Sequence, residues 1–379
     1  MSRLLAFAAT VIVSLGAGSS GNADDIFGHS VRGSLDSQIA EQTRRALIAH
    51  AVPDNDAVAD ALAQEGPPGY LELIELTRRT SVDTAALVLI ARMSRQAQHA
   101  AAQDLYWRYL DRLRRWGREG WPIIVACLGS HDLPEIHFVP GWFYRRNPTT
   151  GADFASQRRL LDALGLRWRL IAVEENASVE ANAAIIAAHV RGLEPSRRVI
   201  LVSTSKGGPE TAHALGALLS PADTAPVRAW VNVGGVLAGS PLADAARTWP
   251  LSWLAWAALA LDGVDAGESL PSLTSARADR RRAAERMPGL VMIFNYVGVP
   301  LSGDVTDAAR DGYDRLRRFG PNDGLTPLVH QWSHGGAVVL EVGLDHFYRD
   351  AEIDIKTAAM AFSVFERLGE IRGRECVRP

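Results

Sequence analysis

A serine, Ser205, stands between a segment typical of a β-strand, residues 199–202, and a segment typical of a helix, residues 210–215. A strand that turns straight into a helix crowds its own backbone, so the positions two before and two after the apex must be small. Ser203 and Gly207 occupy those positions. Such a turn exposes the serine hydroxyl at the edge of a sheet and aims the first amides of the helix at whatever it attacks. The spacing predicts a nucleophile elbow with Ser205 at its apex.

The elbow departs from the usual pattern at one position. The pattern is G-x-S-x-G, and this chain has Ser203 where the pattern has its first glycine. Serine is small enough to weaken the match without breaking it. The motif by itself also fits a polar loop between a strand and a helix. The choice between an elbow and a loop therefore depends on evidence from the rest of the sequence.

A histidine stands where such an elbow needs a base. A serine hydroxyl is a poor nucleophile at neutral pH, so it needs a general base, and the base needs an acid to orient it. The base is expected after the last strand of the sheet. His346, in Gly-Leu-Asp-His-Phe, directly follows the last predicted strand, whereas His330 and His334 precede that strand and should lie at its other end.

The elbow, the segment N-D-G-L-T-P (322–327) and the segment G-L-D-H-F (343–347) follow one another in that order. Together they resemble the α/β-hydrolase superfamily, and within it the bacterial true lipases and related esterases. The resemblance covers roughly residues 134–368. It implies a mostly parallel sheet with helices on both faces and an ester-cleaving activity.

The resemblance also implies roles for three residues. Ser205 would be the nucleophile, His346 the base and Asp323 the orienting acid. Asp304 and Asp307 stand nearer the end of the preceding predicted strand and are the alternatives for the acid. The segment around Asp323 also fits a simple turn.

Two backbone amides are needed to stabilise a tetrahedral oxyanion. The residue after the nucleophile, Lys206, supplies one of them. In the lipases the other comes from the residue after an H-G pair that ends an early strand, and Pro140 and Gly141 stand in that place here. The resemblance therefore makes Trp142 the candidate donor and Phe143 the alternative. A Pro-Gly turn with a buried tryptophan is an equally good interpretation.

The surrounding segments alternate between strands and helices. Runs rich in β-branched residues predict strands at 136–139, 169–173, 199–202, 229–235, 290–297 and 337–342. Periodic apolar segments between and after them predict helices at 156–164, 179–190 and 351–368. This order indicates a parallel sheet covered on both faces, in which chemistry lies at the carboxyl ends of the strands.

Three further regions complete the predicted organisation. Residues 24–121 form a helical N-terminal region without a strand before Pro122, and residues 122–379 form the α/β-hydrolase domain. An insertion at about 239–288 is predicted to be a helical cap over the site. Its aromatic stripe would face an apolar substrate or, as the alternative, pack as ordinary core; its members are Trp249, Trp253 and Trp256.

The N-terminus predicts export. A positive start, an apolar stretch from Leu4 to about Gly18 and small residues up to Ala23 match a signal peptide, residues 1–23. The protein would then be periplasmic or secreted; uncleaved, the segment would be a membrane anchor. An exported chain could pair its two cysteines, Cys127 and Cys376.

Composition excludes several functions. The net charge of −3 gives no reason to expect nucleic acid, and we expect no stable membrane insertion after signal cleavage. The sequence has no metal-ligand spacing and no phosphate-binding loop, so we predict neither metal nor cofactor. The predicted function is a serine hydrolase that cleaves small-molecule or lipid esters through an acyl-enzyme. An amidase, a thioesterase, an acyltransferase and a catalytically silent binding protein remain alternatives.

Overall fold

The computed structural model of the 379-residue chain describes residues 24–26, 29–31, 33–246, 267–332 and 336–371. Four predictions fall outside these residues and stay predictions: the signal peptide, the tryptophan stripe of the insertion, the position of His334 and the pairing of Cys127 with Cys376. Of the helices that are described, none is both long and apolar enough to cross a membrane.

A parallel sheet forms the centre of the described chain, as predicted. Its six strands pair in the order β4-β3-β5-β6-β7-β8, and every pairing is parallel. The strands are β3 (Glu135–Val139), β4 (Trp168–Leu170), β5 (Val199–Thr204), β6 (Val227–Val233), β7 (Met292–Val299) and β8 (Ala337–Val342). Because the strands are parallel, the loops that follow them gather at one edge.

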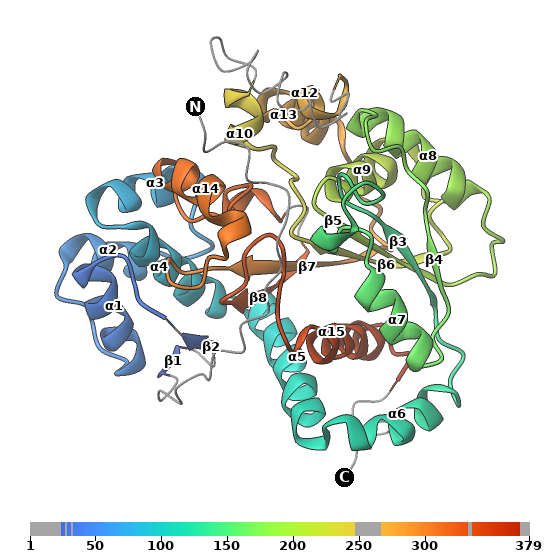
Figure 1. Cartoon of the computed structure of the whole chain (residues 1–379), viewed down its shortest axis with the longest axis horizontal. Helices are drawn as coiled ribbons and strands as arrows, with labels where there is room; N and C mark the ends of the chain where they lie inside the picture. The colour runs from blue at the N-terminus through green and yellow to red at the C-terminus, as the bar shows by residue number, and fades with distance from the viewer. Residues whose placement is uncertain (1–23, 27–28, 32, 247–266, 333–335, 372–379) are drawn as a thin grey trace.

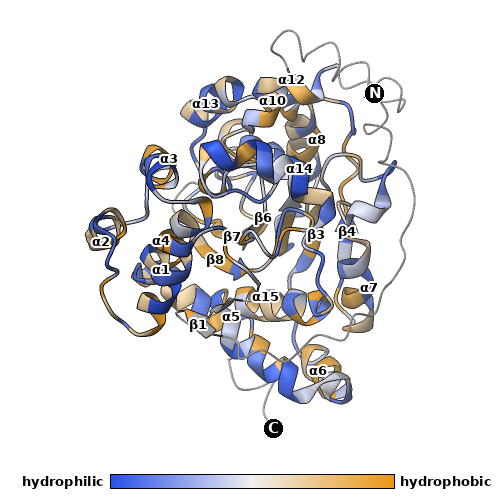
Figure 2. Cartoon of the chain, turned by 60° about the vertical axis from the view of Figure 1, so that its left-hand side comes forward, coloured by the Kyte–Doolittle hydropathy of each residue, from blue (hydrophilic) through white to orange (hydrophobic). Residues whose placement is uncertain are grey.

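Helices cover both faces of this sheet (Figure 1). One face packs in a single apolar cluster with α5 (Ala97–Trp116), α7 (Ala155–Ala163) and α15 (Ile353–Arg367). The other face packs with α8 (Val179–Arg191) and α9 (Gly207–His213) towards β5 and with α4 (Val82–Ser94) towards β8. Along the outer helices hydrophilic and hydrophobic residues alternate (Figure 2), which is the pattern of helices that bury one face.

The remaining helices surround this framework. They are α1 (Gln38–Ile48), α2 (Asp56–Ala63), α3 (Tyr70–Arg79), α6 (Trp121–Leu128), α10 (Pro241–Ala245), α12 (Ser269–Ser272), α13 (Ser275–Ala284) and α14 (Asp307–Leu316). Serine side chains cap the N-termini of several helices. Each accepts a hydrogen bond from the backbone N–H of the residue three positions later, as Ser37 does for α1 and Ser81 for α4.

The N-terminal region is mostly helical, but the prediction that it contains no strand is wrong. Strands β1 (Asp24–Ile26) and β2 (His29–Val31) pair as a short antiparallel hairpin. Three residues are too few for the alternation that signals a strand in a sequence. Helices α4 and α5 of this region also cover the sheet directly, so its apolar residues belong to the central core.

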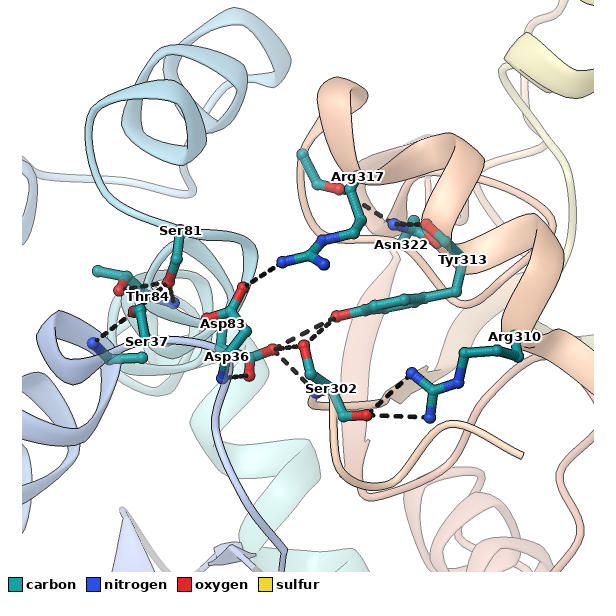
Figure 3. Close-up of polar contacts among 12 residues, drawn as sticks. Asp36, Ser37, Ser81, Asp83, Thr84, Ser302, Arg310, Tyr313, Arg317 and Asn322 are labelled. Carbon is teal, nitrogen blue, oxygen red and sulfur yellow. Dashed lines mark hydrogen bonds and ion pairs between the residues drawn. The ribbon is translucent and has the colours of Figure 1, made fainter. Parts of the chain in front are cut away.

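A buried carboxylate, Asp83, joins the N-terminal region to the loop after β7 (Figure 3). It accepts hydrogen bonds from the backbone N–H of Asp36 (2.7 Å) and from the N–H and hydroxyl of Ser302 (2.9 and 3.0 Å). The hydroxyl of Tyr313 on α14 lies 3.3 Å away, and Asp36 itself forms an ion pair with Arg317 at 3.0 Å. Three distant segments therefore meet at one side chain.

This contact predicts a pH-dependent stability. Burial, followed by the charge of Asp36, raises the pKa of Asp83 to about 6. Because the pKa of Asp83 is higher in the folded than in the unfolded protein, its protonated form stabilises the fold. This stabilisation is complete at a pH below the pKa of the unfolded state and is lost as the pH rises through about 6. Relative to Asp83→Asn, the wild type should therefore lose roughly 2–3 kcal/mol between about pH 4 and about pH 7. Urea unfolding of both proteins measures this difference, and a pH-independent difference would contradict the assignment.

Candidate active site

The backbone at Ser205 has the strained geometry of an elbow. Its φ is 52°, in the left-handed region that non-glycine residues rarely adopt. A Cβ on Gly207 would lie 2.7 Å from the carbonyl oxygens of Val139 and Pro140, so only glycine fits there. Strand β5 thus ends at Thr204 and α9 begins at Gly207, with the Ser205 side chain at the carboxyl edge of the sheet.

Ser203 has a partner that accounts for the departure from the usual pattern. Its hydroxyl accepts a hydrogen bond of 2.8 Å from the indole N–H of Trp230 on β6. Both residues are fully buried. Glycine at position 203 would leave the indole N–H without this acceptor, so the larger residue serves the packing of two neighbouring strands.

The structure brings Ser205, His346 and Asp323 together in one hydrogen-bonded chain. Nε2 of His346 lies 3.0 Å from the Ser205 hydroxyl, and Nδ1 lies 2.6 Å from a carboxylate oxygen of Asp323. With a proton on Nδ1, Nε2 accepts the hydroxyl proton of Ser205. Ser205 follows β5 and His346 follows β8, whereas Asp323 comes from the loop after α14.

Further hydrogen bonds fix the Asp323 carboxylate. The backbone N–H groups of Leu325 and Thr326 donate to Oδ1 at 2.9 and 2.8 Å. The side-chain amide of Gln331 donates to Oδ2 at 2.8 Å, the oxygen that also faces His346. Sequence reasoning missed Gln331, and nothing in the residues around it marks the contact.

The surroundings of His346 act on its pKa in opposite directions. Burial lowers it, but the charge of Asp323, its hydrogen bond and the charge of Asp345 together raise the pKa above its ordinary value. Asp345 is itself held by the backbone N–H and hydroxyl of Thr306, at 2.8 and 2.6 Å. The imidazole is thus oriented by Asp323 and stabilised in its protonated form.

The alternative residues lie in other surroundings. The carboxylate of Asp304 contacts the backbone N–H of Leu301 at 3.4 Å, and Asp307 is exposed at the start of α14. Nδ1 of His330 lies 3.1 Å from the carbonyl oxygen of Gly239, in the loop that follows β6 and contacts the elbow, so the prediction that His330 lies at the other end of the sheet is wrong. Of these acids, only Asp323 has a described contact with His346.

The loop after β3 lies directly against the elbow. A Cβ on Gly141 would lie 3.2 Å from the Cβ of Ser205, so the next residue, Trp142, is close to the serine as well. In the described part of the chain, the backbone N–H groups of Lys206 and Trp142 have no acceptor. The rings of Trp142 and Phe143 stack with centroids 4.3 Å apart, and Phe143 has a φ of 58°.

The side chain of Lys206 turns away from the serine. Its ammonium is buried and forms an ion pair with Glu210 one helical turn later. The amide of Asn182 also donates to Glu210, at 2.7 Å. Burial raises the pKa of Glu210, and the charge of Lys206 opposes this shift. Position 206 can therefore offer the serine its backbone N–H but not its charge.

A cavity of about 1170 Å³ opens at this site. Ser205, His346 and Trp142 line it, together with many apolar residues of the sheet and of α15. The described parts of the insertion contact two lining residues of the cavity, because Leu270 and Leu273 pack in one cluster with Trp142 and Phe143. No group of three or more His, Cys, Asp or Glu residues that could hold a metal occurs among the described residues.

Neither a protein-family model nor a curated protein matches the chain. Solved structures do match it. The metagenomic carboxyl esterase MGS0156 has a TM-score of 0.51 at 21% identity, over 62% of this chain and 76% of that one. The propeptide form of the Bacillus licheniformis lipase BlEst2 has a TM-score of 0.51 at 25% identity, over 63% of this chain and 50% of that one. The chain therefore has the α/β-hydrolase fold, as predicted from its sequence.

Restoring the consensus glycine at position 203 should harm the protein. Ser203→Gly removes the acceptor of a fully buried indole N–H, and an unsatisfied buried donor costs about 1–3 kcal/mol. Urea unfolding measures the loss. Ser203→Ala is the matched control, because it removes the same hydroxyl without adding backbone freedom. Unchanged stability in both variants would show that the indole finds another acceptor.

Proposed function

We propose that this protein is a serine hydrolase that cleaves carboxylic esters through an acyl-enzyme. The observation that carries the proposal is the hydrogen-bonded chain from Ser205 through His346 to Asp323. The first contact supplies a base for the serine hydroxyl, and the second holds the imidazole in the tautomer that can accept the proton.

In the first half of the reaction, His346 Nε2 takes the hydroxyl proton while Ser205 Oγ attacks the ester carbonyl carbon. The backbone N–H groups of Lys206 and Trp142 donate to the oxyanion that forms, and preorganised donors of this kind stabilise the transition state strongly. The imidazolium then gives its proton to the departing alkoxide. The alcohol leaves, and the acyl group remains on Ser205.

In the second half, water replaces the alcohol. His346 takes a proton from the water, the hydroxide attacks the acyl carbon, and the same two N–H groups hold the second oxyanion. Collapse of this intermediate returns the proton to Ser205 and releases the carboxylic acid. The positive charge on His346 is stabilised in both halves by Asp323, which also raises the pKa of the imidazole.

Ester cleavage is preferred over related reactions because the matched structures include a carboxyl esterase and a lipase. A panel of matched esters, thioesters and anilides, with and without added alcohol, separates the alternatives. Fastest turnover of a thioester or an anilide would reassign the substrate. Transfer to the alcohol in place of water would make the protein an acyltransferase, and no turnover at all would leave a binding protein.

Ser205→Ala should abolish labelling by a fluorophosphonate probe and ester turnover. Loss of a triad nucleophile costs on the order of a millionfold in turnover, because no other group can form the acyl-enzyme. The melting temperature, measured alongside, should not fall, since alanine removes only one hydroxyl at this half-buried position. Labelling at another serine, or near-normal turnover, would remove Ser205 from the mechanism.

Asp323→Asn should lower turnover by roughly 10⁴-fold, because the imidazole loses its tautomer and the stabilisation of its charge. As the pH is lowered, the activity that the variant retains should also fall off at a lower pH than the activity of the wild type does. Asp323 raises the pKa of His346, and a base with a lower pKa stays neutral to lower pH. Asp304→Asn and Asp307→Asn are the controls; a deep loss in either, with Asp323→Asn active, would transfer the role of the acid.

A further inference from the structure

The cavity at Ser205 extends beyond the carboxyl edge of the sheet. It continues beneath the sheet, between the strands and the helices α7 and α15, with Phe138, Ile200 and Val231 in its wall. Ile136, which pairs in register with Ile200, lines it too. From Ile200 to Ser205 is five residues of strand, or about 16 Å at the usual rise per residue.

One side of α15 forms the opposite wall. Ile353, Thr357, Ala361 and Val364 recur every three to four residues and all line the cavity. Residues at this spacing lie on one side of a helix. Because α15 starts beside the His346 loop and runs back under the sheet, these positions mark increasing depth from the serine, about 5.4 Å per helical turn.

Two polar residues that line the cavity beside the sheet and α15, Lys356 and Tyr296, are paired with other residues. The Lys356 ammonium forms ion pairs with Glu341 at 2.8 Å and with Asp350. The hydroxyl of Tyr296 contacts that of Tyr106 at 3.0 Å and donates to Glu341 at 3.2 Å. These two groups are therefore not free to bind a charged group of the substrate, and the rest of the lining on the sheet and α15 is mostly apolar.

We propose that this cavity holds the unbranched acyl chain of the ester, so that the substrates are medium- to long-chain fatty acyl esters. Its depth of about 16 Å is close to that of one bilayer leaflet, half of a hydrocarbon core of roughly 30 Å. The chain enters at Ser205 and lies between the sheet and α15. This inference rests on the proposed function, because it places the acyl group of the same acyl-enzyme.

Phenylalanine substitutions at two positions of α15 test how far the acyl chain extends into the cavity. The wild type should hydrolyse p-nitrophenyl esters with kcat/KM rising about threefold to fourfold for each added methylene, the factor that burying one methylene corresponds to. Ala361→Phe should lower the ratio of kcat/KM for the laurate ester to that for the acetate ester by on the order of 100-fold. Thr357 lies one helical turn nearer the serine. Thr357→Phe should therefore lower kcat/KM already for esters with a shorter acyl chain than those affected by Ala361→Phe.

The matched control is Ala163→Phe, at an exposed position of α7 that does not line the cavity. It should keep the wild-type chain-length profile. Melting temperatures show whether each variant is folded. A profile that Ala361→Phe and Thr357→Phe leave unchanged, in an enzyme that hydrolyses short esters, would overturn the acyl path while leaving the ester hydrolase in place.

Binding without turnover separates the two proposals. Titration calorimetry of Ser205→Ala with dodecanoate should show binding that Ala361→Phe, added to the same protein, weakens by on the order of 100-fold. If Ser205→Ala binds dodecanoate but the wild type hydrolyses no ester, the proposed function is overturned, while the cavity remains a binding site for an apolar chain. Absence of dodecanoate binding would overturn the acyl path whatever the turnover.

Discussion

The backbone of Ser205 is the constraint on which the edge of the sheet depends. A non-glycine residue held at a φ of 52° costs on the order of 1–3 kcal/mol, so the surrounding structure has to enforce it. The enforcement comes from close packing. The loop after β3 lies against Gly207, and Gly208 lies against Asn232 of β6, where a Cβ would come within 2.7 Å of the side-chain oxygen. The same packing places Gly141 against the Cβ of Ser205, so the backbone that precedes Trp142 lies beside the strained residue.

Asp323 is held by a different means, a set of hydrogen bonds from loops far apart in the sequence. The Asp323 loop is tied to the insertion, because the hydroxyl of Thr326 donates to the carbonyl oxygen of Gly239 at 2.9 Å. It is tied to α14 through Asn322, whose amide donates to the carbonyl oxygen of Tyr313 at 3.4 Å. Tyr313 in turn contacts Asp83 of the N-terminal region. Regions outside the sheet therefore help to set the position of the acid.

The sequence predicted what depends on local pattern. The parallel sheet followed from β-branched runs separated by helices, and the contact of Ser205, His346 and Asp323 was anticipated because each stands in a short segment of fixed order. Gln331 could not be predicted, since its contact with Asp323 arises only when two loops meet. The cavity beside Ser205 could not be predicted either, because many of its lining residues, such as Ile200 and Ala361, are ordinary apolar residues. A pattern shows which residues face inward but not whether the space between them is filled.

A cavity inside a core has a thermodynamic consequence for the elements around it. Side chains that face an empty space lose packing contacts on that side, so the elements around the cavity depend more on their remaining contacts. Helix α15 is held by contacts with α5 and β8. Tyr106 of α5 donates to Glu341 of β8 at 2.6 Å, and Glu341 pairs with Lys356 of α15. Tyr109 packs on Phe362 with ring centroids 5.5 Å apart. The helical N-terminal region thus supports the wall of the cavity, which gives a physical reason for a segment that carries no recognisable chemistry of its own.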